Sequence, residues 1–407
     1  MLIVAGDVFM ASLYSTKAVA SIGVASGFIN PIFYFGIGLT MGISPSVAKK
    51  RGEGDHRFDG IVSTALYGVC VGLALTLVML FLNQTIPYFG IESILISSMQ
   101  EYIFVIAWSF PFAIFFQAIK EYLQGFEMVI FTNIISILSV FLNLALNFFF
   151  IFGLGDFEGF GEIGLAYASL SIRIVMALVI GIYVFLKLKL GRVSLTYIKE
   201  TLSFSLPIAL MFFVEVLAFC VVSILSGRID IISAATNNLI MTIASVSFMI
   251  PLSLASATSV KVGHAYGLQK RELVVKYIQA SFICVSFFIL CSSLSFFIFP
   301  EFIMNSFSPD QAVVSLGIKI LFIVAIFQFS DGIQVLLSGI LRGLESTKIS
   351  SLLVFIGYWV IGIPSGIYLT FYLGVGVQGL WVGLALSLSI VALALSIITM
   401  KRLKTIL

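Results

Sequence analysis

The stretch SFSLPIALMFFVEVLAFCVVSILS, residues 203–226, is an apolar run that contains a single acidic residue, Glu215. The run is long enough to cross a bilayer, whose hydrocarbon core of about 30 Å takes roughly 20 helical residues. Glu215 lies 12 residues after the start of the run, which at 1.5 Å per residue is about 18 Å deep. Pro207 suits the first turn of a helix. We therefore interpret the stretch as a transmembrane helix that begins near Pro207 and holds a carboxyl group at membrane depth.

The composition extends this interpretation to the whole chain. Of 407 residues, 60% are hydrophobic and only 10% are charged, whereas soluble domains carry about 25% charged residues. The mean hydropathy is +1.16. Breaks in the apolar pattern separate twelve spans, namely 1–16, 19–43, 59–82, 101–124, 129–153, 163–188, 203–226, 233–259, 273–299, 315–341, 350–373 and 379–400. They are too long for barrel strands and lack alternation, so we predict an all-α polytopic membrane protein with twelve transmembrane helices.

The first span differs from the others, since only six residues precede Asp7. Either the first helix is truncated in this chain or its true start lies upstream, and we expect the latter.

Basic residues predict the orientation. Of 22 lysines and arginines, 18 lie beside the even-numbered loops and the C-terminus. Acidic residues such as Glu162 and Glu301 collect in the odd-numbered loops. By the positive-inside rule, the even loops and both termini lie in the cytoplasm. The predicted location is the plasma (inner) membrane, with multiple passes.

Short motifs recur at a nearly constant offset. Gly164-Leu165 and Gly379-Leu380 are 215 residues apart, and Tyr122-Leu123-Gln124-Gly125 and Ile340-Leu341-Arg342-Gly343 are 218 apart. The shared offset predicts two homologous six-helix lobes, residues 1–190 and 191–407. Parallel repeats of this kind are typical of transporters, whose substrate sites lie between the repeats.

Three acids fall inside predicted spans: Asp7, Glu215 and Asp331. An ionised side chain at the bilayer centre costs roughly 2.5–3.5 kcal/mol on insertion scales, so such a residue usually has a function. It can hold a proton, a sodium ion or a cationic substrate. The alternative for each is a protonated carboxyl that makes one hydrogen bond between helices.

Other polar residues in the spans have structural alternatives. Asn143 and Asn147 are four residues apart and share one helix face, where hydrogen bonding between helices is the favoured interpretation. Arg173, in the sixth span, is interpreted as structural, paired with an acid or a helix end.

Several functions are excluded or disfavoured. The phosphate-binding pattern Gly-x-x-x-x-Gly-Lys-Ser/Thr is absent from the sequence, and His56 and His264 both fall in predicted loops. The four cysteines lie in apolar spans and are interpreted as buried free thiols. We expect no cofactor, no nucleic-acid partner and no enzymatic activity, since an intramembrane enzyme needs a nucleophile, base or metal cluster at depth.

The ordered motifs resemble the multidrug and toxic compound extrusion (MATE) family, particularly its NorM-like branch. The resemblance covers essentially the whole chain. The motifs that carry it are Asp7-Val8-Phe9-Met10-Ala11, Ser44-Pro45-Ser46-Val47-Ala48 with Gly52-Glu53-Gly54-Asp55, Leu206-Pro207 with Glu215, Pro251 with Val262-Gly263, and Asp331-Gly332-Ile333-Gln334 leading to Leu341-Arg342-Gly343, Tyr358-Trp359 and Gly362-Ile363-Pro364.

The resemblance implies an antiporter that exports cationic and amphipathic organic compounds in exchange for Na⁺ or H⁺ by alternating access of the two lobes. It implies a cation pair, Glu215 and Asp331, in the C-terminal lobe, where Na⁺ is a candidate ligand. It implies a second site at Asp7, Asn143 and Asn147 in the N-terminal lobe. The expected partners are small organic cations and the lipid bilayer, and the expected state is a monomer. The alternative function is a lipid-linked precursor or metabolite flippase of the same superfamily.

Overall fold

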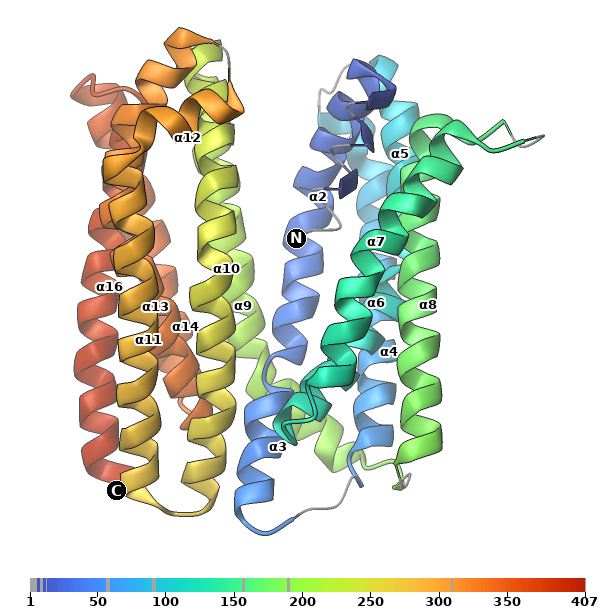
Figure 1. Ribbon diagram of the computed structural model, residues 1–407, viewed down its shortest axis with the longest axis vertical. Coiled ribbons are helices and arrows are strands. Elements are labelled where there is room, and N and C mark those ends of the chain that lie inside the picture. The colour runs from blue at the N-terminus through green and yellow to red at the C-terminus, as the bar shows by residue number, and fades with distance from the viewer. Residues whose placement is uncertain are drawn as a thin grey trace. The chain divides into compact units, whose positions relative to one another are not determined.

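The structure, a computed structural model, describes residues 6–7, 10–11, 13–55, 59–89, 93–155, 158–188, 191–308 and 310–406. These residues are helical almost throughout and include no β-strand (Figure 1). Within them, ten helices are long and apolar enough to cross a membrane, and one bent pair brings the number of spans to eleven. The predicted all-α polytopic fold is thereby confirmed. Most of the predicted first span, 1–16, lies outside the described residues.

Contacts divide the chain into two helical units. Unit 1 comprises Met1–Ser44 and His56–Ala209, and unit 2 comprises Pro45–Asp55 and Leu210–Leu407. The helix α9 (Leu195–Gly227) runs through the division at residues 209 and 210. The helix α3 (Ile43–Gly52) enters unit 2 after Ser44.

The other helices of unit 1 are α2 (Thr16–Thr40), α4 (Ile61–Thr85), α5 (Ser93–Trp108), α6 (Phe110–Gly125), α7 (Ile130–Phe152) and α8 (Gly164–Lys187). Short 3-10 turns, η1 (Ile86–Phe89) and η2 (Gly161–Ile163), follow α4 and precede α8. A buried apolar core joins α2, α4, α5, α6 and the start of α8, with Ile22, Met79, Ile103 and Phe110 at its centre. Between helices in a bilayer, such side chains stabilise the fold by close van der Waals packing, because lipid offers no hydrophobic driving force for their burial.

The other helices of unit 2 are α10 (Ile231–Gly267), α11 (Arg271–Ile298), α12 (Pro300–Phe307), α13 (Gln311–Gly343), α14 (Thr347–Phe355), α15 (Ile363–Ile367) and α16 (Val377–Ile406). Two π-helical segments, η3 (Ile356–Gly362) and η4 (Tyr368–Tyr372), flank α15. The helix α13 packs against α10, α11 and α16, and Figure 1 shows these elements running together in the yellow-to-red half of the chain. The fully buried Trp381 of α16 donates to Asn237 Oδ1 of α10 over 3.1 Å.

Capping side chains set where long helices begin. Asp230 accepts a hydrogen bond from the backbone N–H of Ser233 at the start of α10, and Asp310 accepts one from Ala312 at the start of α13. These carboxyls satisfy donors that the first helical turn leaves without partners. At Asp230, which lies between α9 and α10, the hydrogen bonds from Ser233 lower the carboxyl pKa below its usual value.

Two predicted helix boundaries were wrong. The helix of Glu215 begins at Leu195 and not near Pro207, because Ser194 Oγ accepts a hydrogen bond from the N–H of Tyr197 and caps the helix about three turns before Pro207. Pro207 therefore lies inside α9. The predicted span 101–124 is instead bent by 40° between α5 and α6. Pro111 lies in the first turn of α6 and supplies no N–H to continue the helix from α5.

The internal repeat has a structural counterpart at two helix ends. Two residues after the end of α6 lies Glu127, with φ 62°, and two residues after the end of α13 lies Glu345, with φ 55°. In both, the N–H of this left-handed residue donates three residues back, and the next N–H donates five residues back, from Met128 to Leu123 and from Ser346 to Leu341. The two glutamates are 218 residues apart, which is the offset of the sequence motif that precedes them. The same helix cap thus follows the repeated motif in each unit, and it also follows α3 at Gly54 and α10 at Gln269.

Candidate functional site

The two acids of unit 2 lie together on neighbouring helices. Glu215 of α9 is 8% exposed and Asp331 of α13 is 6% exposed. They are close enough to interact electrostatically. Two carboxylates in such surroundings repel each other, so a bound proton or cation relieves the repulsion. The structure thus brings together the two residues that the sequence pointed to in this lobe.

A tyrosine that the sequence analysis quoted only as part of the Tyr358-Trp359 motif, and not as a site residue, contacts this pair. Tyr358 of η3 is fully buried and its hydroxyl lies 3.4 Å from Glu215 Oε1, where it donates a long hydrogen bond. Its neighbour Trp359 donates to the carbonyl oxygen of Val214 over 3.1 Å. Two consecutive residues of η3 therefore hold α9 beside Glu215. A π-helical segment is rare and often marks a functional site, but its position is not evident from the hydrophobic pattern.

Aromatic rings surround the pair. Phe219, one turn after Glu215, contacts Phe327 and Tyr358 with ring centroids 6.4 Å and 5.8 Å apart, both edge to face. Phe327 in turn contacts Trp381 at 5.5 Å. The carboxyls thus lie in a largely apolar environment, which strengthens their electrostatic interaction with any bound cation.

Asp331 has an oxygen atom without a partner. Within the described residues, Asp331 Oδ1 is buried and accepts no hydrogen bond. Buried polar atoms nearly always have partners, so this atom points to a proton, water or cation. No group of three or more His, Cys, Asp or Glu side chains that could hold a metal ion occurs in the described part of the chain.

The three residues predicted in the N-terminal lobe also lie together. Asn147 Nδ2 donates to Asp7 Oδ1 over 2.8 Å and to Asn143 Oδ1 over 3.3 Å. All three side chains are at least 96% buried. Ser169 of α8, which the sequence analysis missed, donates to Asp7 Oδ2 over 2.9 Å. Both oxygens of Asp7 thus accept hydrogen bonds from the protein, unlike Asp331.

Arg173 gives the N-terminal site a positive charge. It lies one turn after Ser169 on α8 and interacts electrostatically with Asp7. Its Nη1 donates to Ser109 Oγ over 2.5 Å, and its guanidinium lies 4.8 Å from the ring centroid of Phe33. The spacing of Ser169 and Arg173 places both on one helix face. Asp7 therefore already has a cationic neighbour and three polar ones, which distinguishes it from the pair in unit 2.

The fold and the buried carboxyls define a polytopic helical membrane protein with one polar site in each of two units. The MatE family model matches residues 2–149 and 207–368. This chain belongs to the MatE family.

Curated relatives extend over nearly the whole chain. Multidrug resistance protein NorM of Aliivibrio fischeri is 28% identical over 400 residues, covering 93% of this chain and 85% of the relative. Multidrug resistance protein MdtK of Photorhabdus laumondii is 27% identical over 403 residues, covering 94% of this chain and 87% of the relative.

Solved structures share the fold. The eukaryotic MATE transporter AtDTX14 superimposes with a TM-score of 0.88 at 18% identity, covering 99% of this chain and 93% of that chain. A MOP superfamily transporter from Pyrococcus furiosus superimposes with a TM-score of 0.90 at 19% identity, covering 100% of this chain and 92% of that chain. At these identities the likeness establishes the fold alone.

Proposed function

We propose that this chain is a secondary active multidrug exporter that exchanges cationic and amphipathic organic compounds for Na⁺ or H⁺ by alternating access. The observation that carries the proposal is the buried pair of Glu215 and Asp331, which interact electrostatically beside Tyr358. A carboxyl pair of this kind binds a cation in one state and releases it in another. Family membership and the multidrug resistance relatives support export of organic compounds.

Exchange also fits the energetics. Expelling a monovalent cation against about 100 mV costs about 2.3 kcal/mol. One inward coupling cation offsets that electrical term. A second would sustain roughly a further fortyfold gradient, at 1.4 kcal/mol per factor of ten. Coupling requires that the drug and the cation favour different conformations or compete for the same carboxyls.

Transport in proteoliposomes tests this proposal. Ethidium efflux is measured under an inward Na⁺ gradient at fixed pH, and then under an inward pH gradient with choline in place of Na⁺. The wild type is expected to respond to at least one gradient. Glu215→Gln and Asp331→Asn are expected to insert normally and to lose gradient-driven efflux. Efflux of wild-type rate and ion dependence in both variants would refute the coupling role.

The proposal includes a membrane location with cytoplasmic termini, based on the distribution of basic residues. A cysteine placed at Lys348, in a variant without the four native cysteines, should react with a membrane-impermeant thiol reagent only after cells are opened. A cysteine at Glu301 should react in intact cells. The reverse pattern would exclude this orientation.

A lipid-linked precursor flippase of the same superfamily would favour basic residues in the transport pathway. Arg173 is a candidate, but its electrostatic interaction with Asp7 offsets its charge, so we do not adopt this function. No cofactor other than the coupling ion is needed, and a monomer suffices because each of the two proposed sites draws its residues from one chain.

A further inference from the structure

A second buried oxygen atom without a partner lies one turn from Asp331. Gln334 of α13 is 1% exposed, and its Oε1 accepts no hydrogen bond from the described residues. Residues three apart are neighbours on a helix surface, so Gln334 Oε1 and Asp331 Oδ1 are adjacent acceptors that both lack a donor. An amide oxygen is not protonated near neutral pH, so it needs a donor or a cation.

Contacts on either side of Gln334 establish which helix it faces. Phe327, two turns earlier on α13, contacts Phe219 of α9. Ser338, one turn later, accepts a 3.0 Å hydrogen bond from Ser350 of α14, whose hydroxyl lies 3.8 Å from Met211 Sδ of α9. Phe327, Gln334 and Ser338 share one face of α13, since they are seven and four residues apart. Gln334 therefore faces the α9 side of unit 2.

The same contacts fix its level along α9. Met211 and Phe219 are each four residues from Glu215, so they lie one turn before and one turn after it. Phe219 contacts Phe327 directly, and Met211 is linked to Ser338 through Ser350 of α14; Phe327 and Ser338 lie on either side of Asp331 and Gln334 along α13. Glu215 is thus at the level of Asp331 and Gln334. Three oxygen-bearing side chains converge there, two carboxyls and one amide.

Beyond Gln334, another side of α13 packs closely against α10. A Cβ atom at Gly339 would lie 2.5 Å from the carbonyl oxygen of Ala255, and one at Gly343 would lie 2.7 Å from that of Ser259. The backbones of α13 and α10 are therefore in direct contact. Gln328, a buried glutamine of the same helix, has its Oε1 occupied by Ser247 of α10 and Ser292 of α11 at 3.1 Å and 2.8 Å. It differs from Gln334 in having partners for its oxygen.

We propose that Gln334 is a further oxygen ligand of the cation site proposed above at Glu215 and Asp331, and that its amide oxygen makes this site favour a monovalent metal cation, for which Na⁺ is the probe, over a proton. The inference rests on the proposed function and deepens it. A proton exchanged between two carboxyls needs no amide oxygen. A metal cation needs several oxygen ligands to replace its water, and a neutral ligand adds coordination without adding charge.

The first measurement is equilibrium binding of radioactive Na⁺ to the purified protein at fixed pH. Gln334→Leu is expected to weaken Na⁺ binding about tenfold, the effect of losing one ligand to a charged partner. Gln334→Glu is expected to tighten it, because it adds a charge at the same place. Gln328→Leu is the matched control and should leave the Na⁺ affinity unchanged. Unchanged Na⁺ affinity in both Gln334 variants would overturn the proposal, as would a wild type that binds no Na⁺.

The second measurement is ethidium efflux as a function of Na⁺ at fixed pH and of pH in choline. Gln334→Leu is expected to raise the Na⁺ concentration for half-maximal efflux about tenfold and to spare any proton-driven efflux. Efflux by the wild type that follows only the pH gradient would overturn the metal-cation site but leave the exporter intact. No efflux under either gradient, with Na⁺ binding present, would refute the exporter and leave the site standing. The two Gln334 variants are expected to change the Na⁺ affinity in opposite directions. If one of them fails to fold, the other still tests the proposal.

Discussion

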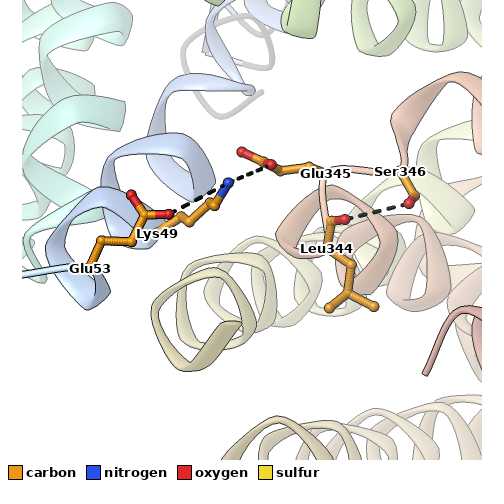
Figure 2. A network of polar contacts seen from close by, with 5 residues as sticks. All are labelled: Lys49, Glu53, Leu344, Glu345 and Ser346. Carbon is orange, nitrogen blue, oxygen red and sulfur yellow. Dashed lines mark hydrogen bonds and ion pairs between the residues drawn. The ribbon is translucent and has the colours of Figure 1, made fainter. Parts of the chain in front are cut away.

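Lys49 of α3 donates a hydrogen bond to Glu345 Oε2 over 2.8 Å, across 296 residues of sequence (Figure 2). Lys49 Nζ also lies 3.6 Å from Glu53 Oε1, one turn along the same helix. Glu345 lies two residues after the end of α13 and has a left-handed backbone conformation, with φ 55°. The ion pair thus connects the segment Pro45–Asp55 to the turn that follows α13, the helix that carries Asp331 and Gln334.

We predict that Glu345→Gln has a small effect on stability. The two side chains are 26% and 36% exposed, and ion pairs with this exposure contribute about 0–1 kcal/mol. Glu345→Gly should be more stable than Glu345→Gln by about 1 kcal/mol, because glycine adopts the left-handed conformation without strain. Thermal unfolding in detergent at low and high salt measures both differences. A loss above about 3 kcal/mol in Glu345→Gln would mean that the pair behaves as a buried one.

Tyr358→Phe should change the cation dependence of transport and leave insertion intact. It removes the 3.4 Å hydrogen bond to Glu215 but keeps the ring contact with Phe219. The expected shift in the half-maximal cation concentration is about tenfold, the lower end of the roughly 1.5–3 kcal/mol that hydrogen bonds to charged groups contribute, because this bond is long. Proteoliposome efflux at varied Na⁺ and varied pH measures it. A lower maximal efflux rate, with no change in the dependence of efflux on Na⁺ or on pH, would mean that Tyr358 contributes only to packing.

Asn147→Ala should destabilise unit 1. It removes the donor to Asp7 Oδ1 and leaves that buried oxygen without a partner, at a cost of about 1–3 kcal/mol. The control is Asn133→Ala on the exposed surface of the same helix, which should change stability by less than about 0.5 kcal/mol. Melting temperatures of the purified variants provide the comparison. Equal effects at the two positions would mean that the Asp7 network contributes nothing specific.

Gly339→Ala should destabilise the protein by disturbing the packing of α13 against α10. Its Cβ atom would lie 2.5 Å from the carbonyl oxygen of Ala255, and such overpacking typically costs about 1–3 kcal/mol. Gly27→Ala in α2 is the control, since nothing lies within 4 Å of its Cβ position. That change should stabilise by up to about 1 kcal/mol through helix propensity. A stable Gly339→Ala variant would show that the two helices can move apart without loss.

The sequence could predict those site residues whose type is unusual within a membrane-spanning segment. Glu215 and Asp331 stand out because lipid-spanning runs exclude carboxyls, and Asn143 with Asn147 stand out by their spacing. Ser169 and Gln334 do not, because a lone serine or glutamine is common between membrane helices. Their importance depends on tertiary contacts, namely that of Ser169 with Asp7 and those between α9 and α13 around Gln334.

The helical class and most of the spans were predictable for a similar reason, since apolar length alone indicates a span. The start of α9 and the bend between α5 and α6 were not. Ser194 caps α9 in a polar segment, where hydropathy does not indicate the start of a helix. A proline such as Pro111 can occur either in the first turn of a helix or at a kink inside one, so the sequence does not show which applies. Only packing selects between them.

The π-helical segments η3 and η4 have a consequence for how this part of the chain compares with its relatives. Each wide turn holds one residue more than an α-helical turn, so residues before Ile356 and after Gly362 are out of phase on the helix surface. Deleting one residue within η3 would turn everything beyond it by about 100°. An alignment of this span with an uninterrupted helix therefore requires a one-residue gap in the middle of a helix. Without that gap, Tyr358 and Gly366 cannot both be matched to residues that occupy the same place in space.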